Sequence, residues 1–214
     1  MLRLHSYYPS SASYRVRIGL ALKNLAYDYV SVDLRAKAQQ QPEYQALNPE
    51  GLVPLLEDDG LCVTQSMAIL EYLDERYPQP ALLPKDLAGR ARVRALAQMI
   101  ACDIHPLNNL RVLQYLVGPL GLSREQKDTW YAHWIHKGLA ACERRLAEEQ
   151  TGAFCHGDSP GLADCFLVPQ VANAVRMGVN LESMPRVREI TDRCNDLPAF
   201  QQAHPSACPD APAA

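Results

Sequence analysis

Three prolines divide the chain into two parts of different character. Pro78, Pro80 and Pro84 fall within the segment YPQPALLPKD, which cannot continue a helix and is typical of a semi-rigid linker. Before this segment short β-favouring runs alternate with helical patterns, whereas after it nearly every pattern is helical. A chain of 214 residues is long enough for two small domains. We therefore predict an α/β domain over residues 1–84, a linker over about 78–86 and an all-helical domain over residues 85–214.

The first part predicts an open sheet with helices packed against it. β-favouring runs occur in RLHSY, YDYVSV and VPLLEDDGLCVT, and the last holds two strands joined by a hairpin at Asp58-Asp59-Gly60. The segment YRVRIGLALKNL fits both a strand and a helix, but its Ala, Leu, Arg and Lys content favours a helix. A further helix over SMAILEYLDERY places Leu70 and Leu73 on one face. The predicted order is β-α-β-α-β-β-α.

The second part predicts three long helices. The first begins near Asp86, and Pro106 should kink it because its ring crowds the carbonyl of Cys102. The second opens with a capping box between Ser123 and Gln126, and the third runs from about Leu162 to Met177. A Pro- and Ala-rich tail follows His204, and we expect it to be frayed.

Composition excludes several classes of protein. The formal charge is −3, no basic run is present, and no segment has the roughly 18 apolar residues of a membrane helix, so neither a nucleic acid nor a membrane is an expected partner. The N-terminus has no signal-like apolar core, so we expect a soluble, cytoplasmic protein. The seven cysteines form no CxxC pair and are interpreted as reduced thiols. Cys102 and His105 have metal-like spacing, but no second pair completes a zinc site, so no metal is expected.

The serines Ser10, Ser11 and Ser13 lie between a strand end and a helix start. One interpretation is an N-cap, in which a hydroxyl accepts a hydrogen bond from a helix amide. In the second interpretation, the hydroxyl and the free amides of the positive helix end stabilise an anion such as a thiolate. A free thiol has a pKa of about 8.5, and a charge-assisted hydrogen bond plus the helix dipole can lower it by about two units.

Two further segments of the first part have the features of a binding site. Pro54 at a strand start is a candidate cis peptide, and the backbone ahead of it can bind an extended peptide by strand-like hydrogen bonds. Ser66 is predicted to cap the next helix, where Gln65 and Ser66 together can hold a carboxylate. Two helix N-termini and one strand edge in a small domain suggest an anionic, peptide-like ligand.

These segments are where the chain resembles a known family. The paired serines and the run SSASYRVRIGL resemble the signature of the zeta class of cytosolic glutathione transferases, which includes maleylacetoacetate isomerase and maleylpyruvate isomerase. Further matches are YQALNP, VP, QSMAILEYL, DIHPLNNLRVL and ADCFLVPQVANA, spread over essentially the whole chain. The resemblance implies a thioredoxin-like N-terminal domain, an all-helical glutathione-transferase C-terminal domain, a homodimer, and glutathione as cofactor.

The resemblance also implies a role for individual residues. Ser10 is expected to face the glutathione sulfur, with Ser11 beside it, and Val53 to bond the cysteinyl part through its main chain. Gln65 and Ser66 are expected to take the γ-glutamyl carboxylate, and Gln39 to reach the glycyl end. The remaining residues of the expected glutathione cleft are Ala12, Ser13, Tyr14, Arg15, His105, Asn109, Leu110 and Arg111.

Arginines are the candidates for binding an anionic substrate. Arg15, Arg111 and Arg176 could hold its carboxylates, and Arg111 and Arg176 are favoured; the alternative for each is a solvated helix charge. We assign Ser10, Ser11 and Arg176 as the catalytic residues. His105 is either a structural histidine or, as favoured here, a ligand contact.

Two positions depart from the family pattern. Ala12 stands where many zeta enzymes have a cysteine, so chemistry that depends on that thiol is not expected. Pro9 stands where members often carry an arginine, which removes one cation for a substrate carboxylate.

The implied reaction is glutathione-dependent cis–trans isomerisation of a small anionic cis-enoic keto acid. Maleylacetoacetate, from homogentisate breakdown, is the first substrate expected and maleylpyruvate, from gentisate breakdown, the second. A transferase or dehalogenase acting on small α-halo acids is a third possibility, and a non-catalytic interaction module is a fourth. Residues 1–84 carry 7 basic and 10 acidic side chains, and residues 85–214 carry 14 of each. Neither part has a net positive charge, so an anion site must be formed by helix ends and individual arginines and not by bulk charge.

Overall fold

The computed structural model describes residues 1–212, which form two compact units. The first unit begins at Met1, runs to Leu82 and resumes at Asp196, and the second spans Leu83–Asn195. The exit from the first unit lies within three residues of the predicted boundary at residue 84. The residues from Asp196 onward belong to the first unit. The sequence analysis had placed them in the helical domain over residues 85–214. Each unit is described by itself below.

The first unit is an α/β domain with the predicted element order. Its principal elements are β1 (Arg3–Ser6), α1 (Ser11–Leu22), β2 (Asp28–Ser31), α2 (Pro42–Leu47), β3 (Leu55–Asp58), β4 (Leu61–Thr64), α3 (Ser66–Arg76) and α9 (Pro198–Ala203).

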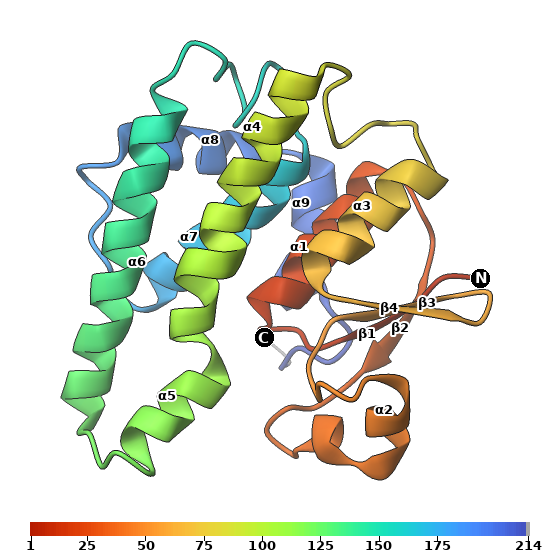
Figure 1. Cartoon of the computed structure of the whole chain (residues 1–214), viewed down its shortest axis with the longest axis vertical. Coiled ribbons are helices and arrows are strands. Elements are labelled where there is room, and N and C mark those ends of the chain that lie inside the picture. The colour runs from red at the N-terminus through yellow and green to blue at the C-terminus, as the bar shows by residue number, and fades with distance from the viewer. Residues whose placement is uncertain (213–214) are drawn as a thin grey trace. The chain divides into compact units, whose positions relative to one another are not determined.

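The strands of the first unit form one mixed sheet in the order β2-β1-β3-β4. β1 pairs in parallel with β2, placing Arg3 opposite Asp28, and antiparallel with β3. β3 and β4 form the predicted hairpin, whose turn residues Asp59 and Gly60 have φ values of 47° and 90°. These left-handed values are those that a two-residue turn requires, and they suit Asp-Gly. Helices α1 and α3 cover one face of the sheet and α2 lies on the other (Figure 1).

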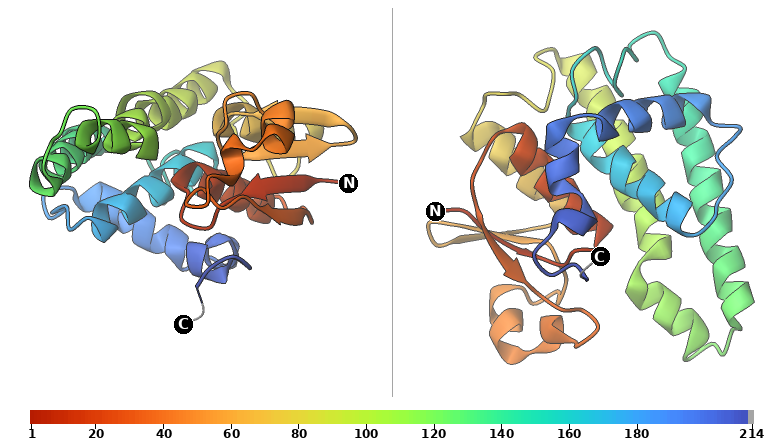
Figure 2. Two further views of the ribbon diagram at one scale, coloured as in Figure 1. Left: turned by 90° about the horizontal axis from the view of Figure 1, so that it is seen from below. Right: turned by 180° about the vertical axis from the view of Figure 1, so that it is seen from behind.

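The core of the first unit accounts for the position of α1. Val16, Ile18 and Leu20 of this helix are fully buried, as are Leu70 and Leu73 of α3. The helical interpretation of YRVRIGLALKNL is therefore confirmed. Burial of nearly the whole helix explains its ambiguous pattern, because a helix enclosed on all sides has no polar face to reveal its period. α9 packs against α1, as the view from behind shows (Figure 2).

The C-terminal segment corrects one expectation. The tail after His204 was expected to be frayed, but it forms a short 3-10 helix over Pro205–Ala207 and is hydrogen-bonded through Asp210 to Tyr8, Tyr29 and Ser31. Residues 213 and 214 of the tail lie outside the described residues.

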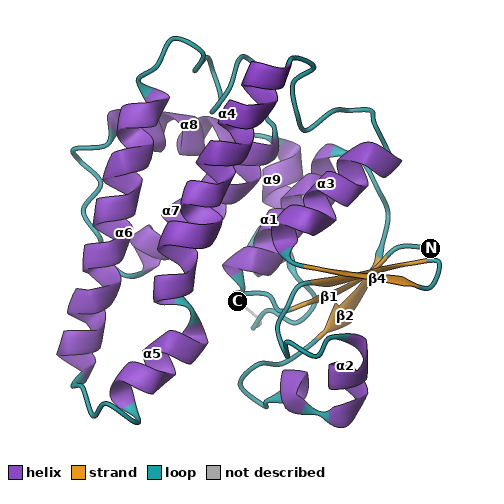
Figure 3. Cartoon of the chain, in the orientation of Figure 1, coloured by secondary structure: helices purple, strands orange, loops and turns teal. Residues whose placement is uncertain are grey.

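The second unit is all-helical, as predicted (Figure 3). Its helices are α4 (Leu87–Gln98), a π-helical segment (Met99–Ile104), a 3-10 turn (His105–Asn108), α5 (Leu110–Val117), α6 (Arg124–Leu146), α7 (Leu162–Arg176) and α8 (Pro185–Asn195).

Helix α7 is the centre of the second unit. It is buried from Leu162 to Val171 and packs against α4 and α8. The predicted capping box of α6 is present, because Ser123 Oγ accepts from Gln126 N–H at 3.1 Å and the Gln126 side chain accepts from Ser123 N–H at 2.8 Å.

The predicted interruption near Pro106 begins further upstream. The α-helix gives way to π-helix at Met99, seven residues before the proline. Pro106 is the second residue of the 3-10 turn, which begins at His105. Gly138 of α6 leaves room for the Ile104 side chain, which a Cβ at that position would overlap. The altered helical winding thus sets the orientation of the segment with the predicted ligand residues.

Among residues 1–212 no helix is both long and apolar enough to cross a membrane.

Candidate functional site

Ser10 is the N-cap of α1. Its Oγ accepts a hydrogen bond from Ser13 N–H at 3.2 Å, and its own N–H donates to Tyr7 O at 2.9 Å. The capping interpretation is therefore confirmed. A serine hydroxyl that accepts one hydrogen bond still has a proton to donate. The half-buried Ser10 can consequently cap the helix and donate to an anion at the same time.

The neighbouring predicted residues of this helix differ in exposure. Ser11 is 8% exposed and Ala12 is half-buried, whereas Ser13 and Tyr14 are 0% and 2% exposed. Ser13 contributes its backbone N–H to Ser10, and the Tyr14 ring meets His204 edge-on at 6.0 Å. Only the first residues of the motif thus offer side-chain surface to a ligand.

Arg15 occupies a place that sequence reasoning missed. Its side chain is buried, at 2% exposure, and its Nη1 donates to Ser66 Oγ at 3.1 Å. The sequence made Arg15 one of three candidates for direct contact with a substrate carboxylate. Burial instead puts the cation behind Ser66. No pattern in the sequence signals this, because the two residues are 51 positions apart.

The start of α3 has the strained geometry of a binding site. Gln65 has φ +67°, in a region that residues other than glycine rarely adopt, and Ser66 is buried as the first helical residue. The expectation that Ser66 caps the helix was wrong, because Gln65 is the N-cap and the Ser66 hydroxyl is engaged with Arg15. Strain of this kind, of order 1–3 kcal/mol, concentrates at ligand sites. A positive helix end backed by a buried guanidinium is suited to a carboxylate.

Glu50 is a second residue that sequence reasoning missed. Its carboxylate accepts two hydrogen bonds from Gln65 Nε2, at 2.9 and 3.1 Å, which orient the amide. Glu50 lies in the turn NPEG, where Asn48 Oδ1 accepts from Glu50 N–H at 3.0 Å. An acidic residue in a structured turn beside a proposed binding strand was the available signal.

The Val53-Pro54 peptide is cis, as predicted. Val53 precedes β3, whose paired residues begin at Leu55, so its main chain lies outside the sheet ladder. Gln39 belongs to a 3-10 turn (Ala38–Gln40) whose carbonyl oxygen approaches Gly51, where a Cβ would lie 3.2 Å from it. The structure thus brings Gln39 against the turn that leads to Val53.

In the second unit, the predicted ligand residues lie on one short stretch. Asn109 is the N-cap of α5, with its Oδ1 accepting from Arg111 N–H at 3.2 Å and its Nδ2 lying 3.4 Å from His105 Nε2. Leu110 is 45% exposed and Arg111 is exposed. Arg111 is a cation in the first turn of a helix, where the dipole disfavours it. An anionic ligand would offset that cost.

Arg176 ends α7, as predicted. Its Nη2 donates to Asn173 Oδ1 at 2.9 Å, which fixes the direction of the guanidinium. Burial raises the pKa of Tyr131, and the neighbouring Arg176 opposes that rise. Arg176 therefore lies at the end of α7 beside the phenol of Tyr131 from α6, and a guanidinium has more N–H donors than the bond to Asn173 uses.

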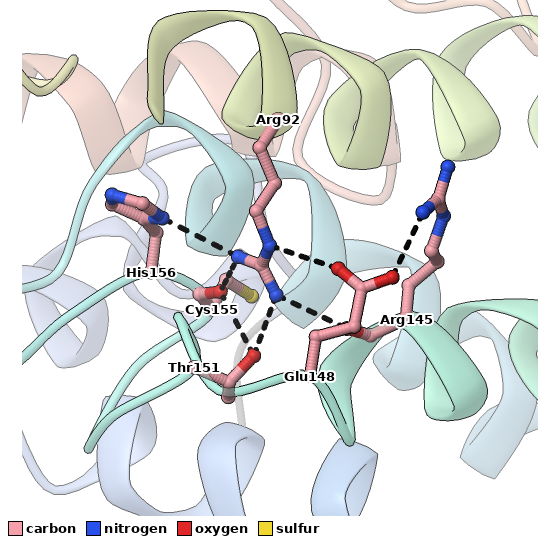
Figure 4. Close-up of polar contacts among 6 residues, drawn as sticks. All are labelled: Arg92, Arg145, Glu148, Thr151, Cys155 and His156. Carbon is pink, nitrogen blue, oxygen red and sulfur yellow. Dashed lines mark hydrogen bonds and ion pairs between the residues drawn. The ribbon is translucent and has the colours of Figure 1, made fainter. Parts of the chain in front are cut away.

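The second unit also contains a cavity of about 660 Å³ that none of the predicted residues line. Arg92 is its central polar group and ties α4 to the end of α6 and to the loop that follows (Figure 4). Its Nε donates to Glu148 at 3.2 Å, and its two terminal nitrogens approach Cys155 O, His156 Nδ1, Arg145 O and Thr151 Oγ1. Because each of its three nitrogens contacts a partner within the protein, we assign this guanidinium a structural role.

Residues 1–212 contain no group of three or more His, Cys, Asp or Glu side chains arranged to hold a metal ion. All seven cysteines lie in this range and none forms a disulfide. Five of them are buried, and burial raises the pKa of Cys142 to about 12.

Comparison with known proteins identifies the family. Residues 1–75 match the model of the glutathione S-transferase N-terminal domain, and residues 126–200 match that of the C-terminal domain. The chain is 50% identical to maleylacetoacetate isomerase of Pseudomonas aeruginosa over the full length of both. A solved maleylpyruvate isomerase, described as a bacterial zeta-class glutathione S-transferase in its holo form, matches with a TM-score of 0.96 and 43% identity, covering 98% of this chain and 100% of the matched chain.

A second solved structure is maleylacetoacetate isomerase of Anaeromyxobacter dehalogenans with glutathione in the active site. It matches with a TM-score of 0.89 and 50% identity, covering 99% of this chain and 98% of the matched chain. Both family models and the solved structures agree with the two-domain fold described above. The chain therefore belongs to the glutathione S-transferase family, and within it to the zeta class.

Proposed function

We propose that this protein is a glutathione-dependent cis–trans isomerase that converts maleylacetoacetate to fumarylacetoacetate in homogentisate breakdown. The observation that carries the proposal is the pair of helix N-termini in the first unit, one with the hydroxyl of Ser10 and one with Ser66 backed by the buried Arg15. Full-length relatives named maleylacetoacetate isomerase support the choice of reaction.

The residues of the first unit fit glutathione. Its γ-glutamyl carboxylate requires an anion site, and Ser66 at the start of α3 supplies one, with Gln65 held beside it by Glu50. The main chain of Val53, outside the sheet ladder, suits the cysteinyl peptide, and Gln39 lies close enough to that turn to serve the glycyl end.

In this proposal, Ser10 donates a hydrogen bond to the glutathione sulfur. Its hydroxyl donates to the thiolate while its oxygen keeps the cap to Ser13, and both the hydrogen bond and the helix dipole lower the thiol pKa. Ser11 supports this end of the site from the first turn of α1. The chemistry that glutathione supplies when bound is reversible thiol addition to the cis double bond, which permits rotation before the thiol leaves.

In this proposal, two arginines of the second unit bind the substrate. Arg176, aimed by Asn173, and Arg111, exposed at the start of α5, hold the carboxylates of the keto acid. Asn109 orients the first turn of α5, and His105 and Leu110 flank it. Arg15 takes no part in substrate binding in this proposal, because it is buried behind Ser66.

The two departures from the family pattern have separate consequences. Ala12 leaves the first turn of α1 without a thiol, so alkylating agents that act on a cysteine there have no target. Pro9 offers no cation before Ser10, so the carboxylates depend on Arg111 and Arg176.

Isomerase assays test the proposal. Purified protein is added to enzymatically generated maleylacetoacetate with and without glutathione, and formation of the trans product is followed. Isomerisation that requires glutathione supports the proposal. No isomerisation, or a rate independent of glutathione, contradicts it.

Maleylpyruvate is the second candidate substrate. The specific observation is the similarity to the solved maleylpyruvate isomerase, with a TM-score of 0.96. The same assay with maleylpyruvate, from gentisate breakdown, decides between the two by the ratio of their kcat/KM values.

We further propose a homodimer in which the first domain binds glutathione and the second binds substrate. The exposed side of α4 supports an interface, since Leu87 is 86% exposed and is followed by the small exposed residues Ala88, Ala91 and Ala95. Light scattering should give twice the chain mass of 23.8 kDa. A cytoplasmic location is proposed because seven cysteines without a disulfide suit a reducing compartment.

A further inference from the structure

The C-terminal segment is bound to the loop that leads into Ser10. Asp210 is the only acidic side chain in the sequence after Asp196. Its Oδ2 accepts from Tyr8 N–H at 3.1 Å and from Ser31 Oγ at 3.1 Å, and its Oδ1 accepts from Tyr29 Oη at 2.6 Å. Burial and the bond to Asp210 together raise the pKa of Tyr29, so its phenol stays a donor.

The opposite side of the same loop is held by Arg17. This residue is 2% exposed, and its Nη2 donates to Tyr8 O at 3.0 Å. It also donates through Nη1 to Ser6 Oγ at 3.1 Å and through Nε to Ala203 O at 3.0 Å, the end of α9. Both polar groups of the Tyr8 backbone are thus bound by charged side chains.

The connection from Tyr8 to Ser10 is short. Pro9 is the residue between them and has a restricted φ, and Ser10 N–H donates to Tyr7 O at 2.9 Å. A shift of Tyr8 therefore moves Ser10. Loops before helices are usually the mobile parts of a domain, and here two charge-assisted anchors, one of them from a residue 202 positions away, fix this loop.

We propose that Asp210 is a positioning residue for the reaction: it binds the backbone of Tyr8 so that the Ser10 hydroxyl stays directed at the glutathione sulfur. The inference rests on the proposed function, since it takes Ser10 as the donor to the thiolate. A displacement of about 1 Å in a reacting group costs roughly a hundredfold in rate. Loss of one of the two anchors of Tyr8 permits part of such a displacement.

The test is Asp210→Asn in the full chain. Asparagine keeps the size but loses the charge and replaces one carboxylate oxygen with an NH2 donor, so the charge-assisted bond to Tyr8 N–H becomes at best a neutral one of about half the strength. We expect kcat to fall about tenfold, while the dissociation constant of glutathione changes less than about twofold because its carboxylate end is bound at α3. The pKa of the bound glutathione thiol should rise, which ultraviolet absorbance of the thiolate measures across pH without any substrate.

Three variants are compared with it. Asp196→Asn makes the same chemical change on an exposed carboxylate of the same segment and should leave kcat and the thiol pKa unchanged. Tyr29→Phe removes the shortest bond to Asp210 but leaves the contact with Tyr8, so it should lower the melting temperature without shifting the thiol pKa. Truncation of the chain after Cys208 also removes Asp210, so it should reproduce the effect of Asp210→Asn.

Two results overturn the inference. One is a folded Asp210→Asn protein whose bound thiol has the wild-type pKa. The second is Tyr29→Phe and Asp210→Asn lowering kcat in proportion to their loss of stability, which would make the segment only structural. Failure of the proposed function is distinguishable, because it appears in the wild-type isomerase assay, whereas the thiol titration tests Asp210 on glutathione alone.

Discussion

Arg15 Nη1 lies 3.1 Å from Ser66 Oγ, and this hydrogen bond places a buried guanidinium directly behind the N-terminus of α3. The charge and the helix dipole have the same sign at this point, so they reinforce one another toward an anion. Low exposure keeps solvent from screening them. This local arrangement is the basis of the anion site that we propose in a unit with more acidic than basic side chains.

Removal of this cation should weaken glutathione binding. Arg15→Met keeps the length of the side chain and removes its charge and donors, so we expect the KM for glutathione to rise by about 10- to 100-fold, the value of one or two charge-assisted hydrogen bonds. The variant and wild type should differ little with cysteinylglycine, which lacks the γ-glutamyl carboxylate. Arg3→Met, at an exposed cation of the same unit, is the control. An equal loss with both thiols would contradict a carboxylate site at α3.

Replacement of Ser10 separates its two roles. Ser10→Ala should lower kcat by about 10- to 100-fold at neutral pH and cost about 1 kcal/mol of stability, because both the donor to the thiolate and the cap are lost. Ser10→Asp keeps an acceptor for Ser13 N–H but brings a negative charge to the thiolate, so stability should be near wild type while activity is lost. Melting temperature and kcat are measured for both. Unchanged turnover in Ser10→Ala would leave Ser10 as a helix cap alone.

Variants of Arg111 and Arg176, the arginines proposed to bind substrate, should change KM according to the charge of the substrate. Arg176→Ala and Arg111→Ala each remove a carboxylate partner, and we expect KM for the dianionic substrate to rise about tenfold or more. With a neutral aryl halide as the electrophile for glutathione conjugation, KM should stay within about twofold. Arg188→Ala, at an exposed arginine of α8, is the matched control. Equal effects on charged and neutral substrates would argue against carboxylate binding.

The pairing of His5 with Glu57 predicts a dependence of stability on pH. The hydrogen bond from His5 lowers the pKa of Glu57 below its ordinary value of 4.5. A lowered acid pKa stabilises the fold fully above the unfolded value, and the stabilisation is lost as pH falls through the folded value. Glu57→Gln should therefore cost about 1 kcal/mol above pH 4.5, and the difference from wild type should shrink below it. Urea unfolding at a series of pH values measures this; a difference that grows in acid would refute it.

Local signals in the sequence were sufficient for most of the fold. Ser123 and Gln126 start a helix because they satisfy each other's backbone groups, and Asp59-Gly60 turns a hairpin because both residues tolerate a positive φ. Ser10 could be identified as a cap for the same reason. Each of these features depends on residues within a few positions of one another.

Local reasoning failed where a distant residue competes for the same group. Ser66 resembled a cap, but Arg15 takes its hydroxyl, and the cap position passes to the strained Gln65. The tail was expected to fray because it is terminal and rich in Pro and Ala, but Asp210 is bound by three donors from another part of the chain. The π-helical segment that precedes Pro106 ends at Ile104, whose side chain packs against the distant Gly138 of α6.

Short-range patterns in the chain were enough to predict an α/β first part followed by helices, the order of strands and helices in the first part, and Ser10 as the cap of α1, but not the return of the C-terminal segment to the first unit. These follow from steric and hydrogen-bonding preferences that act over a few residues. The charges that lie behind those helix ends, Arg15 at Ser66 and Asp210 with Arg17 at Tyr8, became visible only in the folded molecule. Electrostatic interactions depend on the distance between groups and on their burial. Both quantities are determined here by residues as far as 202 positions apart in the chain.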